Sequence, residues 1–200
     1  MSQAQRIEQY VARRLRWLRD LPEHPRKAAL AHLRRGVGRA PGDLPELWGI
    51  FLEGMPEELE SQTGKPTQGE WAIYLALTLY ALHQQGHTLP GDDMNRQGVG
   101  LGQAVRRLVP QGEDPADSSI QRRFNALATA AQTREIAQHL RGMIQHLRAA
   151  EVPLGYAQLA KDLFYLQFPD SASQVRLRWG QDFYAIPSEN DQIEEETNYG

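Results

Sequence analysis

Cysteine is absent from the 200-residue sequence, so the chain can form neither a disulfide nor a thiolate metal site. The lack of cysteine is typical of proteins of a reducing compartment, and we expect a cytoplasmic location. Long apolar runs are scarce too. The longest, roughly residues 71–82, is too short for a membrane span and favours a buried core helix. Residues 1–20 are too charged for a signal peptide, so we expect no membrane partner.

Motifs for catalysis and cofactor binding are also missing. The sequence contains no Gly-x-Ser-x-Gly nucleophile motif and no His-Glu-x-x-His zinc motif. The glycines of residues 98–102 have neither the spacing nor the preceding strand of a dinucleotide-binding loop. His83 and His87 lie four residues apart, but no third metal ligand accompanies them. We therefore expect no enzyme activity, no cofactor and no metal site.

The alternation of apolar and polar residues that marks a half-buried strand is absent as well. Apolar residues recur instead at intervals of three and four, which is the spacing of one helical face. The sequence therefore predicts an all-α fold, made of two small helical bundles. The expected helices cover approximately residues 3–20, 25–35, 44–52, 71–82, 101–108, 120–131, 136–147, 154–166 and 171–183.

A break in the helical pattern between residues 86 and 100 suggests the domain boundary. This stretch contains Pro90, Gly91 and an Asp-Asp pair, all of which favour loops. We expect an N-terminal helical bundle over residues 1–90 and a C-terminal one over residues 98–184. Residues 185–200 carry five acidic residues and no basic one, so we expect an acidic, disordered tail.

The net charge of −3 conceals a strong segregation of charge along the chain. Residues 1–39 hold ten Lys and Arg against three acidic residues, whereas residues 40–70 hold one against seven. Residues 96–150 are basic again, with eight Arg against four acidic residues. Two basic blocks favour a polyanionic partner. Ordinary solvated helix faces would give the same counts, so the charge pattern alone leaves both interpretations open.

Three expected helices between Gly98 and Arg148 carry arginines beside their apolar stripes. The arginines placed in this way are Arg106, Arg107, Arg122, Arg123, Arg141 and Arg148. Our hypothesis is that they converge on one surface and contact nucleic-acid backbone, because the planar guanidinium suits phosphate oxygens. From charge alone we add four arginines of the N-terminal block, namely Arg13, Arg14, Arg34 and Arg35. The four tryptophans, Trp17, Trp48, Trp71 and Trp179, occupy apolar helix positions, and we expect them in the core.

The second half of the sequence resembles a known family, the CasB small subunits of type I-E CRISPR Cascade complexes. The resemblance covers roughly residues 70–184 and rests on the order and spacing of several short pieces. They are Gly98–Leu108 (GVGLGQAVRRL), Arg123–Leu127 (RFNAL), His139–Arg141 (HLR), Leu147–Arg148 (LR), Leu159–Leu163 (LAKDL) and Val175–Tyr184 (VRLRWGQDFY).

The resemblance implies a non-catalytic, all-helical subunit of two small bundles that is present as a pair in its complex. It implies a place along the ribonucleoprotein beside guide RNA paired with target DNA, where the subunit helps to hold the displaced strand. By position, the family's basic surface matches Arg106, Arg107, Arg123, Arg141 and Arg148. Arg122 and the N-terminal arginines are added from charge alone.

Two functions remain as hypotheses at this point. The first is a sequence-independent nucleic-acid-binding subunit of a CRISPR surveillance complex, which contacts guide RNA and target DNA backbone and stabilises the R-loop. Its expected partners are guide RNA, target DNA, other Cascade subunits and a second copy of itself. The alternative is a helical protein–protein adaptor whose basic faces meet acidic proteins and which has no affinity for nucleic acid.

Overall fold

The computed structural model describes residues 1–185, and the acidic tail expected from residue 185 onward lies almost wholly outside the described residues. The helices are α1 (Gln3–Asp20), α2 (Glu23–Arg35), α3 (Trp48–Phe51), α4 (Gln68–His83), α5 (Leu101–Arg106), α6 (Ser119–Thr129), α7 (Thr133–Ala149), α8 (Tyr156–Tyr165) and α9 (Pro169–Tyr184). Three short 3-10 turns accompany them: η1 (Pro45–Leu47), η2 (Glu57–Leu59) and η3 (Pro115–Asp117). The described part of the chain contains no strand, so the all-α prediction is confirmed.

Several helices begin at side chains suited to capping. The Ser2 hydroxyl accepts from the Gln5 amide at the start of α1, and Thr67 does the same for Glu70 at the start of α4. The Ser118 hydroxyl accepts from the Gln121 amide and fixes the start of α6. The start of α6 sets where Arg122 and Arg123 lie on the helix.

The helix α4 packs against helices of both halves of the chain, namely α1, α2, α7 and α8. Every residue from Ala72 to Ala81 is buried, which confirms the expected core helix. None of the helices within residues 1–185 is long and apolar enough to span a membrane.

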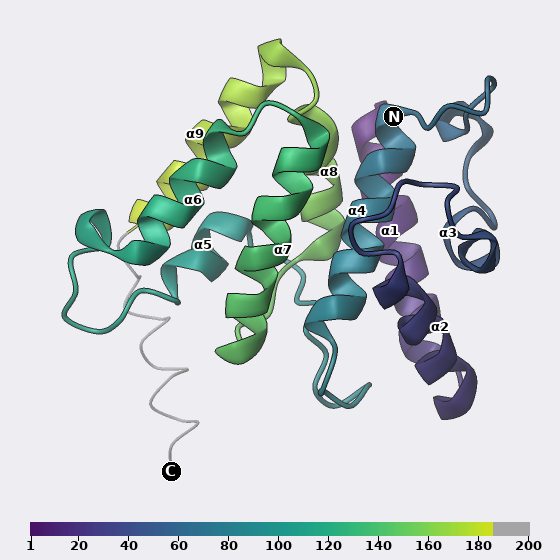
Figure 1. Ribbon diagram of the computed structural model, residues 1–200, viewed down its shortest axis with the longest axis horizontal. Coiled ribbons are helices and arrows are strands. Elements are labelled where there is room, and N and C mark those ends of the chain that lie inside the picture. Colours follow the sequence, from purple (N-terminus) through teal and green to yellow (C-terminus); the bar gives the residue numbers. More distant parts are fainter. Residues whose placement is uncertain (186–200) are drawn as a thin grey trace.

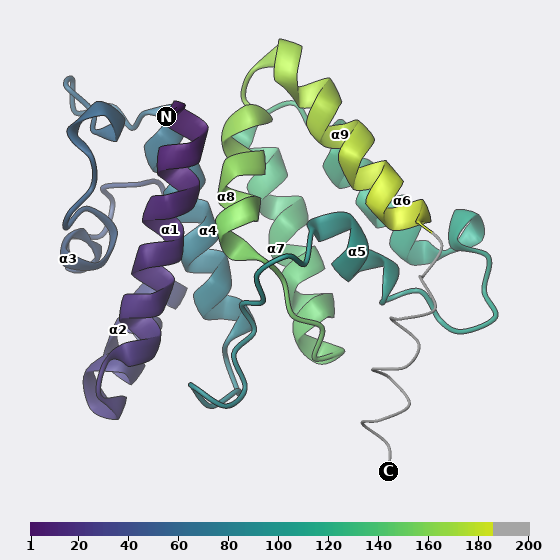
Figure 2. The same ribbon diagram turned by 180° about the vertical axis from the view of Figure 1, so that it is seen from behind.

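The two halves of the chain share one core. Figures 1 and 2 show α1, α2 and α4 on one side of the molecule and α5, α6, α7 and α9 on the other, with α8 between them. Although α8 follows the expected boundary, it packs against α1 and α4, and α7 also contacts α4. Helices from the two sides of residues 90–98 thus pack against one another. That residues 1–90 and 98–184 form two separate bundles stays a prediction.

The close contact between α5 and α9 fixes the C-terminal half. A Cβ atom on Gly102 would lie 2.2 Å from the Trp179 carbonyl oxygen, so only glycine allows this approach. Trp179 and Phe183 of α9 then pack against Phe124 of α6, with ring centroids 6.0 and 5.5 Å apart. This aromatic cluster holds α6 against the core and leaves its polar side facing outward.

Candidate nucleic-acid interface

A groove between α6 and α7 collects two of the predicted arginines. The apolar stripes of both helices are buried, which leaves their polar flanks along the seam between them. Figure 1 shows the two helices side by side, with α6 in front of α9 and α7 in front of α8. The groove encloses about 520 Å³ and is lined by Ser119, Arg122, Arg123, Ala126, Gln138, His139, Gly142 and Met143. No acidic side chain is among these lining residues.

The two groove arginines are available to a ligand. Both are exposed, and the Arg123 side chain forms no hydrogen bond or ion pair within residues 1–185. The Arg122 Nη1 donates to the Asp117 carbonyl oxygen at 2.9 Å, which orients the guanidinium and leaves its other donors free. Across the groove, the His139 Nε2 lies 3.9 Å from the Glu135 carboxylate. The groove therefore presents two arginine cations, one of them oriented by a hydrogen bond, and one imidazole ring.

Sequence reasoning did not place His139 in this group. It lies three residues after the buried Ile136, at the edge of the α7 stripe, and only the pairing of α6 with α7 brings it opposite the arginines. Gly142 adds to the groove because no atom lies within 4 Å of the place where its Cβ would be. A side chain there would fill space that a ligand can enter.

The other predicted arginines of the second half lie outside this groove. Arg141 and Arg148 are seven residues apart and so share one side of α7. At the end of α7, the Arg148 Nη1 donates to the Gln85 Oε1 at 3.0 Å, just beyond the end of α4. Arg141 is exposed, and within the described residues its side chain has no polar partner.

Arg106 and Arg107 lie at the end of α5. Arg107 is exposed and Arg106 is half-buried. Like Arg141, neither is tied to an acidic side chain in residues 1–185. Neither of them lines the α6–α7 groove.

The N-terminal arginines are more engaged with the protein itself. Arg14 is 6% exposed, and its Nε and Nη2 donate to the Ile50 and Gly49 carbonyl oxygens, both at 2.9 Å. Its position on the α1 stripe, between Val11 and Leu18, is a sequence signal for this burial. An arginine in that state has few donors left for a phosphate.

The remaining three N-terminal arginines differ in their exposure. The Arg13 Nη2 donates to the Gly54 carbonyl oxygen at 2.6 Å. Arg35 forms an ion pair with Glu46 at 3.4 Å. Arg34 is half-buried, and burial lowers its pKa. These three side chains lie away from the α6–α7 groove.

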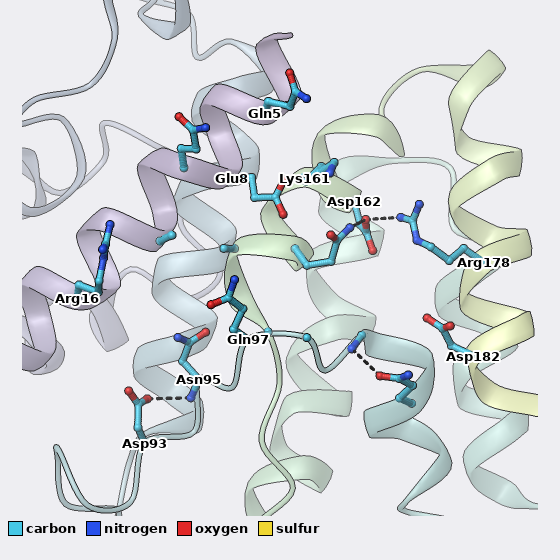
Figure 3. A pocket seen from close by; sticks show the side chains of 18 of the residues that line it. Gln5, Glu8, Arg16, Asp93, Asn95, Gln97, Lys161, Asp162, Arg178 and Asp182 are labelled. Atoms are coloured by element: carbon cyan, nitrogen blue, oxygen red, sulfur yellow. Dashed lines mark hydrogen bonds and ion pairs between the residues drawn. The ribbon is translucent and has the colours of Figure 1, made fainter. Parts of the chain in front are cut away.

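A larger groove lies among α1, α5, α8, α9 and the segment before α5, which stand in front in Figure 2. It encloses about 1110 Å³, and Figure 3 shows acidic and basic side chains alternating along it. Lys161 pairs with Glu8 at 2.9 Å, and Arg178 pairs with Asp162. The carboxylates of Glu8, Asp93, Asp162 and Asp182 also line this groove, which makes it less suited to a phosphate backbone than the α6–α7 groove, whose lining has no acidic residue.

Asp162 has a structural role in that groove. Its carboxylate is buried and accepts from Gln158, Arg178 and the Trp179 indole, the last at 2.8 Å. Burial raises its pKa, and the three donors oppose that effect. The bonds from Arg178 and Trp179 tie α8 to α9. Within residues 1–185, no group of three or more His, Asp or Glu side chains is arranged to hold a metal ion.

Comparisons with known proteins give consistent results. The model of the CRISPR-associated protein Cse2 family matches residues 29–184. The crystal structure of CasB from Thermobifida fusca is similar, with 34% sequence identity, a TM-score of 0.75, and coverage of 90% of this chain and 98% of that one. A CRISPR-associated Cse2-family protein from Thermus thermophilus has 27% identity, a TM-score of 0.62, and coverage of 88% and 98%. No curated protein sequence matches the chain.

Proposed function

Because the chain belongs to the Cse2 family of CRISPR-associated proteins, and is therefore a subunit of a CRISPR Cascade complex, we propose that it is a non-catalytic subunit that binds nucleic-acid backbone without sequence preference. The α6–α7 groove is the proposed contact. The observation that carries the proposal is the charge of this groove: its lining includes two exposed arginines and no acidic residue.

The chemistry of the groove suits phosphate rather than bases. A guanidinium offers a planar fork of donors that matches phosphate oxygens. Phosphate contacts supply affinity and register but carry no sequence information. A subunit that meets a different target each time needs this property, since pairing with the guide supplies the specificity.

The proposed partners are guide RNA, target DNA, the other Cascade subunits and a second copy of this chain. In the complex, the contact would stabilise the R-loop. R-loop formation exchanges one duplex for another of similar stability, so a few backbone contacts can shift the balance. Arg106, Arg107, Arg141 and Arg148 would add basic surface outside the groove; Arg107 and Arg141 are the exposed members of this set, and Arg148 is bonded to Gln85.

The experiment compares two double variants of equal net charge. Arg122→Ala with Arg123→Ala removes both groove arginines. The control, Arg16→Ala with Arg39→Ala, removes two exposed arginines from the other half of the chain. Binding of each to labelled single-stranded DNA, single-stranded RNA and DNA duplex is followed by fluorescence anisotropy over a range of salt concentrations. R-loop formation by the assembled complex is measured in parallel, because a subunit that works by avidity can bind weakly alone.

We expect the groove variant to bind roughly tenfold more weakly than the control, a difference of about 1.4 kcal/mol. For single strands, its log–log salt slope should fall by about 1.4, which corresponds to two lost phosphate contacts. Equal affinities and equal R-loop yields for the two variants would reject the groove as the contact. The protein–protein adaptor would be favoured by two results together. The isolated chain would bind no oligonucleotide, and neither double variant would change the R-loop yield of the assembled complex.

A further inference from the structure

Trp48 is exposed although it lies in an apolar segment. The side chain is 52% exposed, whereas Trp179 is 1% exposed and Trp17 and Trp71 are half-buried against the core. The expectation of a core position is therefore wrong for Trp48. The physical reason is that its neighbours Leu47, Ile50 and Phe51 take the inward positions of this short turn and leave the indole on the outer side.

The turn that carries Trp48 is held rigidly by side chains of α1. The Tyr10 hydroxyl lies 2.9 Å from the Phe51 carbonyl oxygen and 3.1 Å from that of Glu53. Arg14 donates to the Gly49 and Ile50 carbonyls, and Arg13 to that of Gly54. Nearly every carbonyl from residue 49 to residue 54 thus has a donor from one helix.

This rigidity has a consequence for binding. An aromatic side chain on a fixed backbone loses little conformational entropy when a partner covers it. Tryptophan is also among the residues that most often dominate the energy of protein–protein interfaces. The turn therefore presents a preorganised anchor residue.

The charge of the segment that carries Trp48 selects the kind of partner. Residues 40–60 contain six acidic residues and no basic one. Three of these acids pair with arginines elsewhere, for example Glu46 with Arg35 at 3.4 Å. Asp43, Glu57 and Glu60 are exposed and form no ion pair within residues 1–185. Arg6, Arg13, Arg14 and Arg35 contact this segment and offset part of its charge, but the three unpaired acids keep it net acidic. This charge favours a cationic protein surface over a phosphate backbone.

We propose that Trp48, Asp43, Glu57 and Glu60 form a docking surface for a cationic protein surface, an arginine- or lysine-bearing face of another subunit of the complex. A guanidinium can stack on the exposed indole while neighbouring cations meet the carboxylates. This surface is separate from the α6–α7 groove. The inference rests on membership of a multisubunit complex and stands even if the groove does not bind nucleic acid.

The first test is oxidative footprinting of the wild-type chain, with oxidation of each tryptophan measured by mass spectrometry. It compares the isolated chain at low and high concentration, the chain with a single-stranded oligonucleotide, and the complex assembled from guide RNA and the other protein subunits of its own CRISPR system. We expect Trp48 to be oxidised readily in the first three samples and protected at least fivefold in the complex. Undiminished oxidation in the complex would overturn the proposal. Protection by high concentration alone would assign the surface to a second copy, and protection by the oligonucleotide alone to nucleic acid.

The second test uses variants in the assembled complex. Trp48→Ala should lower the fraction of complexes that retain this subunit at least fivefold, and Trp48→Tyr should restore most of it. Glu57→Lys with Glu60→Lys should lower retention as well. Leu177→Ala is the matched control, because Leu177 is 64% exposed on α9 and has no acidic cluster in its sequence neighbourhood. Retention of the Trp48→Ala subunit equal to that of the control would contradict the assignment.

Discussion

Replacing Arg14 by methionine separates its structural role from a role in nucleic-acid binding. The guanidinium is buried, donates to two carbonyl oxygens at 2.9 Å and lies 4.0 Å from the centre of the Trp17 ring. Methionine keeps much of the apolar volume and removes every donor. The variant therefore tests whether the turn over residues 49–54 depends on these bonds.

The size of the effect follows from the bonds that are lost. Each hydrogen bond from a charged donor contributes about 1.5–3 kcal/mol, and each buried carbonyl without a donor is a further penalty. Removing the cost of burying a cation offsets part of this loss. We expect a net destabilisation of about 3 kcal/mol, which for a chain of this length lowers the melting temperature by roughly 10 °C.

The assay is urea denaturation followed by circular dichroism, with Arg16→Met as the control. Arg16 lies on the same helix and is exposed, so its replacement should change the unfolding free energy by less than about 0.5 kcal/mol. At temperatures where Arg14→Met is folded, it should bind oligonucleotide as well as the control does. Equal stability of the two variants would refute the structural role, and a selective loss of oligonucleotide binding by Arg14→Met would restore it as a contact residue.

Two further predictions concern the core. Burial lowers the pKa of His83 to about 4 from its ordinary value of 6.5, so the unfolded chain binds a proton more readily. Stability should fall as pH drops through this window, by about 2 kcal/mol between about pH 7.5 and about pH 5, and His83→Gln should abolish that part of the pH dependence in urea titrations. In α9, no atom lies within 4 Å of a Cβ on Gly180, so Gly180→Ala should raise the unfolding free energy by about 0.5–1 kcal/mol. Gly102→Ala should lower it by about 2 kcal/mol or more, because the new methyl meets backbone of α9. Similar melting temperatures for the two glycine variants would contradict the close packing of α5 on α9.

The helices could be predicted from the sequence because their signals are local. Apolar residues at intervals of three and four mark α1, α6 and α7. The place of α8 could not be predicted. Its contacts with α1 and α4 join residues far apart in sequence, and no pattern within a single helix encodes them.

The candidate site was predictable only in part for the same reason. Periodicity showed that Arg122 and Arg123 lie outside a buried stripe, but not that α7 would place His139 across from them. Charge counts treated every arginine alike, although Arg14 is buried and Arg35 is paired with Glu46. The composition of a segment gives its charge, whereas the packing decides which charges remain available.

Site-specific photocrosslinking in the assembled complex tests the central claim most directly. A photoreactive benzoylphenylalanine replaces Gln138, which is exposed in the α6–α7 groove, or Gln9, which is exposed in the polar groove of Figure 3. We predict that the complex bearing the group at position 138 crosslinks to guide RNA or target DNA during R-loop formation, and that the complex bearing it at position 9 does not. Crosslinks from position 9 alone, or crosslinks from position 138 only to protein, would contradict the account.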